Sequence, residues 1–257
     1  MQATKRKGTV IMLHGWAQNT FVMKSRTAKL EKKLNQVGYE CIYLEAPHLL
    51  PMTSTVAIDG KEVQITNGER KNAKAWFVYS TTDSADASMS LEETSMEYVG
   101  LDTSIDQVKE CLAQCNDNLC AILGFSQGAT FCHILSMLSC AAKQNNDDPN
   151  NSEAYPFAKI QCAILFSGFP SMHDNGSFSA NSKNTAHNKL DLRSLHIFGG
   201  NDTSVPKRYG EKLANLFSNP ETYDHGKGHV IPHNAILCER VIEFLDSCHA
   251  DDNLKGF

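Results

Sequence analysis

Short apolar runs alternate with amphipathic stretches along most of this 257-residue chain. Runs rich in β-branched and other apolar residues predict buried strands, and they cover residues 9–13, 39–44, 119–123, 159–166 and 194–198. Helical periodicity falls between and after them, at residues 21–37, 101–112, 127–142 and 206–217 and in a last stretch with Leu237, Val241, Phe244, Leu245 and Cys248 on one face. Strands that alternate with helices pair in parallel, in a sheet covered on both faces. The pattern therefore predicts an α/β fold, and because no linker divides it we expect a single domain over residues 1–257.

Three segments interrupt this alternation. Residues 48–97 lack a clear period, and we expect an irregular, lid-like segment there with a hairpin around Ile58–Lys61. Residues 144–152 and 171–188 are rich in Asn, Ser and Asp, a composition typical of surface loops. We therefore expect these last two segments to be surface insertions into the single domain.

Composition and charge argue against several classes of function. The formal net charge is -5, whereas nucleic-acid binding needs a basic surface, so we expect no nucleic-acid partner. No run approaches the ~20 apolar residues of a transmembrane helix, and no secretory signal is visible. The nine cysteines have no metal-ligand spacing, and several lie inside apolar runs. We expect a cytoplasmic protein with reduced thiols, no metal and no other cofactor.

The segment Gly124–Gly128 reads GFSQG and matches G-x-S-x-G, with a predicted strand before it and a predicted helix after it. Small residues on both sides of the serine leave room for a strained turn that lifts the hydroxyl clear of the sheet. The simpler alternative is a tight strand-to-helix turn that contains a serine. We take Ser126 as the candidate nucleophile.

A serine hydroxyl needs a histidine base, which a carboxylate orients. In this architecture the acid follows the serine along the chain, and the histidine comes last. Asp202 follows the strand 194–198 in the segment GGND, where strand ends meet the active-site edge of the sheet. Its alternative role is helix entry before Pro206, and the weaker acid candidates are Asp174 and Asp191.

Position alone separates the histidines that follow Asp202. His229 lies in the Gly-rich loop GKGHVIP, which is free to turn inward, and it is the candidate base. The alternatives are His225, His233 and His249, and any of them could be a solvated loop histidine.

Acyl transfer also requires N–H donors for the developing oxyanion. The backbone N–H groups of Trp16, after the segment LHG, and of Gln127, after the serine, are placed to supply them. We expect the ring of His14 to hold this loop rather than to act as a base.

Four motifs together resemble one family. LHGWAQN, GFSQG, GGNDTSVP and GKGHVIP resemble the serine hydrolases typified by the ovarian-cancer-associated serine hydrolase and its fungal relatives. The resemblance implies an α/β-hydrolase fold that lacks the first strands of larger members. It also implies a triad of Ser126, Asp202 and His229, with Trp16 and Gln127 as oxyanion donors. The two Asn/Ser-rich insertions depart from the compact family pattern.

The resemblance implies a serine carboxylesterase that hydrolyses acyl esters, fatty-acyl esters above all, through an acyl-enzyme. The substrate would be a small-molecule acyl ester or thioester. The alternatives are an acyl-protein thioesterase, a lysophospholipase-like hydrolase, or a hydrolase-fold binding protein with little turnover. Trp76 and Phe77, with residues 49–52, are candidates for an acyl pocket, and ordinary core or hairpin packing is the competing interpretation.

Overall fold

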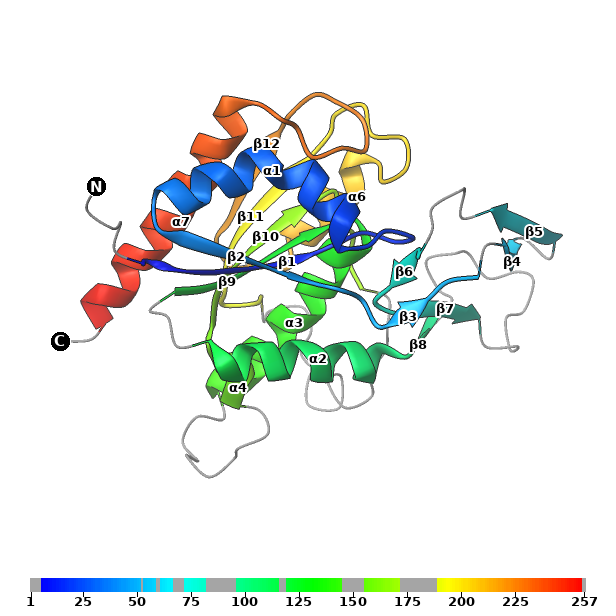
Figure 1. Ribbon diagram of the computed structural model, residues 1–257, viewed down its shortest axis with the longest axis horizontal. Helices are drawn as coiled ribbons and strands as arrows, with labels where there is room; N and C mark the ends of the chain where they lie inside the picture. Colours follow the sequence, from blue (N-terminus) through cyan, green and yellow to red (C-terminus); the bar gives the residue numbers. More distant parts are fainter. Residues whose placement is uncertain are drawn as a thin grey trace.

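A computed structural model describes residues 6–51, 53–58, 61–66, 72–81, 96–115, 119–144, 155–171 and 189–255. At its centre lies a six-stranded sheet with the order β12-β11-β10-β9-β1-β2 (Figure 1). The strands are β1 (Gly8–Leu13), β2 (Tyr39–Leu44), β9 (Leu119–Phe125), β10 (Ile160–Phe166), β11 (Arg193–Phe198) and β12 (Pro220–Asp224). Every neighbouring pair in this sheet is parallel. The predicted α/β class is confirmed.

Helices cover both faces of the sheet (Figure 1). On one face lie α1 (Thr20–Gln36) and α7 (Ala235–Lys255). On the other lie α2 (Leu101–Gln114), α3 (Gln127–Gln144), α4 (Tyr155–Ala158) and α6 (Lys207–Ala214). Alternate residues of β1 divide between the two clusters, with Val10 and Met12 facing α1 and α7 while Ile11 and Leu13 face the other layer. This period of two buries both faces of a strand that is apolar throughout.

Three two-stranded antiparallel pairs lie within the segment predicted to be irregular. β3 (His48–Leu49) pairs with β6 (Lys74–Ala75), and β7 (Val78–Thr81) pairs with β8 (Met96–Val99). β4 (Thr53–Ile58) pairs with β5 (Lys61–Thr66), with Ile58 opposite Lys61, which confirms the hairpin. The insertions at 144–152 and 171–188 lie outside the described residues except at Gln144 and Ser171.

The order of the strands determines where a ligand can bind. From β1 the chain moves outward to β2, and it later returns as β9 on the other side of β1. In open α/β sheets, ligands bind beyond the carboxyl ends of the strands where the order reverses in this way. Leu13 at the end of β1 pairs with Gly124 near the end of β9. The loop after β1 and the turn at Ser126 therefore meet at this position.

Candidate active site

Ser126 occupies a strained turn between β9 and α3. Its φ is +54°, in the left-handed region, which costs a residue other than glycine ~1–3 kcal/mol. Its backbone N–H donates to the carbonyl of Phe166 at the end of β10, at 2.9 Å. A Cβ at Gly124 would overlap the backbone of Gly128, and a Cβ at Gly128 would overlap the carbonyl of Leu13. The spacing G-x-S-x-G is therefore a steric requirement of this turn.

Asp202 and His229 form a hydrogen-bonded pair. His229 Nδ1 lies 2.7 Å from Asp202 Oδ2, and the Asp202 side chain is fully buried whereas that of His229 is 23% exposed. The other carboxylate oxygen, Oδ1, accepts the backbone N–H groups of Ser204 and Val205, each at 2.9 Å. Since an ionised carboxylate only accepts, we assign the proton to Nδ1, which leaves His229 Nε2 as an acceptor.

Two opposing effects set the pKa of Asp202. Burial raises it, but the hydrogen bonds from the Val205 N–H and from His229, together with the charge of His229, outweigh burial, and the pKa lies below its ordinary value. The carboxylate therefore stays ionised at neutral pH.

The Asp202–His229 pair lies beside the turn that carries Ser126. The imidazole of His229 packs on the ring of Phe125, the residue before the serine, with ring centroids 4.7 Å apart. Within the described chain, no hydrogen bond joins the Ser126 hydroxyl to His229. Such bonds are often long in sites without substrate and tighten only in the complex. The structure thus brings the three predicted residues into one region at the ends of β9, β11 and β12.

Of the two predicted oxyanion donors, Trp16 lies in the loop after β1 and Gln127 is the first residue of α3. Neither the Trp16 nor the Gln127 backbone N–H has an acceptor among the residues that the structure describes. The Gln127 side chain, in contrast, is buried and fully engaged: its Oε1 accepts the Trp76 N–H at 3.0 Å and its Nε2 donates to the Phe77 carbonyl at 2.7 Å. Sequence reasoning missed this side-chain role, because it depends on a segment far away in the chain.

The side chain of His14 holds the loop after β1 in place. Its Nε2 accepts the Ala46 backbone N–H at 3.1 Å, so Nδ1 carries the proton that it donates to the Gly15 carbonyl at 2.9 Å. Burial lowers the pKa of this imidazole, which favours the neutral form. This geometry fits the structural role that we predicted for His14.

Trp76 and Phe77 belong to the core. Both are fully buried, and Trp76 stacks on Phe131 with ring centroids 5.1 Å apart while its Nε1 donates to the His14 carbonyl at 2.7 Å. Phe77 stacks on Tyr98 at 4.1 Å. These contacts favour the packing interpretation over an acyl pocket for both rings.

The alternative acid and base candidates are placed less favourably. Asp174 is outside the described residues, and Asp191 precedes β11, at the end of the strand opposite to Asp202. The Nδ1 of His225 accepts the backbone N–H of Lys227 at 3.2 Å. His233 is exposed on the surface, and His249 lies near the end of α7.

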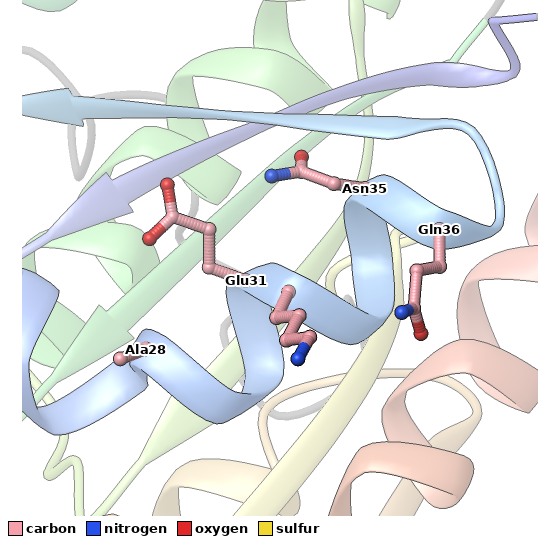
Figure 2. A pocket seen from close by; sticks show the side chains of 5 residues that line it. Ala28, Glu31, Asn35 and Gln36 are labelled. Atoms are coloured by element: carbon pink, nitrogen blue, oxygen red, sulfur yellow. The ribbon is translucent and has the colours of Figure 1, made fainter.

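A surface hollow on α1 lies apart from these residues. It is lined by Ala28, Glu31, Lys32, Asn35 and Gln36 (Figure 2). They belong to the part of α1 that leads into the amino end of β2, whereas the candidate site lies at the carboxyl ends of the strands. The hollow contains no candidate site residue.

No group of three or more His, Cys, Asp or Glu side chains could hold a metal ion in the part of the chain that the structure describes. Among the same residues, none of the helices combines the length and the apolar character that crossing a membrane requires.

Comparison with known proteins agrees with the motifs. Residues 1–240 match the family described as Serine hydrolase (FSH1). Esterase OVCA2 of Xenopus tropicalis is 30% identical and aligns over 95% of this chain and 94% of its own, and the Homo sapiens Esterase OVCA2 is 28% identical over 95% and 98%.

Solved structures share the fold. The Zea mays acyl-protein thioesterase 2 superposes with a TM-score of 0.54 at 20% identity, covering 94% of this chain and 95% of its own. Esterase PE8 superposes with a TM-score of 0.53 at 17% identity, covering 96% and 94%. At this identity the likeness shows the α/β-hydrolase fold alone. The matched family, together with the esterase relatives, shows a hydrolase of the esterase type. The chain belongs to the serine hydrolase (FSH1) family.

Proposed function

We propose that the protein is a serine carboxylesterase that hydrolyses fatty-acyl esters through an acyl-enzyme, with Ser126, Asp202 and His229 as its triad. The observation that carries the proposal is the 2.7 Å hydrogen bond between a fully buried Asp202 and His229, beside the strained turn at Ser126. An orienting carboxylate, a histidine with a free acceptor nitrogen and a serine on an elbow are what acyl transfer needs.

The first half-reaction forms the acyl-enzyme. Ser126 Oγ attacks the ester carbonyl carbon while His229 Nε2 takes the hydroxyl proton, and Asp202 stabilises the resulting imidazolium. The carbonyl oxygen becomes an oxyanion, which accepts the backbone N–H groups of Trp16 and Gln127. When the tetrahedral intermediate collapses, His229 returns its proton to the leaving alcohol.

The second half-reaction releases the acid. Water enters, His229 Nε2 removes a proton from it, and the hydroxide attacks the acyl carbon. When the tetrahedral intermediate collapses, the bond from the acyl carbon to Ser126 Oγ breaks, His229 gives the proton to Oγ, and the carboxylic acid departs. A thioester would follow the same steps with a thiol as the leaving group.

The cysteines support a reducing compartment, and we place the protein in the cytoplasm. All nine lie within the described residues, and no disulfide joins any two of them. Disulfides are rare where glutathione and thioredoxin keep thiols reduced.

A fluorophosphonate probe tests the proposal, because it reacts only with an activated serine. Wild type should be labelled, Ser126→Ala should not, and Ser25→Ala, which removes an exposed serine of α1, should be labelled like wild type. If wild type is not labelled, the proposed esterase activity is rejected and a hydrolase-fold binding protein is favoured.

A substrate series then identifies the leaving group and the acyl chain. The series contains oxygen esters and thioesters of the same acyl groups, from acetyl to palmitoyl. The kcat/KM should be higher for long-chain oxygen esters than for short-chain ones and than for the matched thioesters. A higher value for the matched thioesters would assign the protein to the thioesterase alternative instead.

A further inference from the structure

Two loops bring the proposed acid and base together. One follows β11 and carries Asp202, and the other follows β12 and carries His229. Phe198 and Asp224, the last residues of these neighbouring parallel strands, are partners in the sheet register. Asp224 therefore stands at the point where both loops begin.

One oxygen of Asp224 bridges the two loops. Its Oδ1 accepts the Gly200 N–H from the first loop and the Gly226 N–H from the second, each at 2.8 Å. The other oxygen, Oδ2, accepts Lys207 Nζ from the start of α6 at 2.9 Å. A single carboxylate thus fixes the separation of the two loops.

Asn201 adds a second connection between the same loops. Its backbone N–H donates to the Lys227 carbonyl at 3.2 Å, and its Nδ2 donates to the Gly226 carbonyl at 2.9 Å. The loop residues in these contacts, Gly200, Asn201, Gly226 and Lys227, all lie within three residues of Asp202 or His229. Small shifts of either loop would therefore change the hydrogen bond between the acid and the base.

We propose that Asp224 is a positioning residue that holds Asp202 and His229 in the relative positions that acyl transfer needs. This inference rests on the proposed function. It touches neither substrate nor reacting atoms, and it acts through the two loops. Groups that orient catalytic side chains in this way are needed because misplacement by ~1 Å costs up to about 100-fold in rate.

The surroundings of Asp224 keep it ionised. Its hydrogen bond from the Gly226 N–H, followed by the contact with Lys207, lowers the pKa of this carboxyl below its ordinary value. The side chain is 33% exposed. A substitution there removes no core contact, so the variants should fold.

Three variants separate positioning from general stability. Asp224→Ala removes the shared acceptor, and Asp224→Asn keeps an oxygen that can accept both N–H groups. Lys207→Met removes the amine that pairs with Asp224 and Glu211 and leaves both loop contacts of Asp224 in place. Each folded variant is measured in two ways, at a temperature well below its Tm. The first is the rate at which a fluorophosphonate labels Ser126, and the second is the low-field NMR resonance of the proton between His229 and Asp202.

Asp224→Ala should slow labelling by about 10-fold to 100-fold and should broaden or shift the low-field resonance. Asp224→Asn and Lys207→Met should stay within about threefold of wild type. An Asp224→Ala protein with a lower Tm but with wild-type labelling and resonance would overturn the proposal, because Asp224 would then only stabilise the fold. If wild type itself is not labelled, the proposed function fails, and the resonance alone still decides whether Asp224 positions the pair.

Discussion

Acid should destabilise this protein well above the pH at which carboxylates titrate, because burial keeps histidines in the neutral form, His133 and His196 most strongly. His133 on α3 and His196 on β11 are 5% and 1% exposed, and both rings pack around Phe217. The Nδ1 of His133 accepts the Ser171 N–H at 3.2 Å. His196 Nε2 lies 3.0 Å from Ser194 Oγ, and its Nδ1 has no partner among the described residues.

Burial determines how these rings titrate. It lowers the pKa of His133 from 6.5 to about 4. Burial, and then the neighbouring His133, lowers the pKa of His196 from 6.5 to about 3. In the unfolded chain both rings bind protons at the ordinary pKa. The unfolded state therefore binds more protons below pH 6.5, and the stability that these rings contribute above 6.5 is lost as the pH falls towards 4 and 3.

The size of the effect follows from these pKa values. At pH 5, each histidine reduces the free energy of unfolding by about 2 kcal/mol relative to pH 7.5, or about 4 kcal/mol together. That is a large share of the ~5–15 kcal/mol of a typical domain. Asp202 and Glu45, whose pKa values are lowered, lose their contributions only in more acidic solution, so they do not obscure this range.

Urea denaturation at pH 7.5 and 5.0 measures the effect directly. The loss of unfolding free energy between the two pH values should shrink by about 2 kcal/mol in His196→Asn, whose side chain does not titrate. His233→Asn removes an exposed histidine and should leave the loss as in wild type. An equal loss in wild type and His196→Asn would refute the reasoning.

Three further predictions concern the site and its supports. Asp202→Asn should lower kcat by about 10³-fold to 10⁴-fold with little change in Tm, because the amide favours the wrong tautomer of His229; a loss below tenfold in steady-state kinetics would contradict this. Trp76→Ala should lower the free energy of unfolding by ~3–5 kcal/mol in urea titrations and reduce turnover of short and long esters in the same proportion. A larger loss of turnover on long esters than on short ones would instead support an acyl pocket at Trp76. Gly128→Ala should yield little folded protein, as judged by circular dichroism, since its Cβ has no space beside Leu13.

The sequence predicted most of the central sheet because its four inner strands, β1, β9, β10 and β11, are buried on both faces. A run such as residues 119–125 is apolar throughout and stands out from its surroundings. β12 reads PETYD, lies at the sheet edge and has no such run, so apolar periodicity could not locate it. α6 ends at Ala214 rather than at Phe217, because the chain turns there to pair Leu190 with Phe217.

The candidate site was predictable as far as its chemistry follows chain order. Ser126, Asp202 and His229 fall in the order that the fold requires, and the structure joins the last two directly. Asp224 could not be found in this way, because its role depends on backbone N–H groups from two loops. The same holds for the Gln127 side chain, whose partners are fixed only by the folded position of residues 76–77.

Gln127 has a consequence for how mutants of this turn are interpreted. Its backbone N–H is the proposed oxyanion donor, while its side-chain amide binds the Trp76 N–H and the Phe77 carbonyl. A side-chain substitution leaves the backbone N–H chemically intact but releases residues 76–77, which connect β6 to β7. Any drop in rate in such a mutant would therefore report coupling between residues 76–77 and the turn at Ser126, and not the loss of the proposed oxyanion donor.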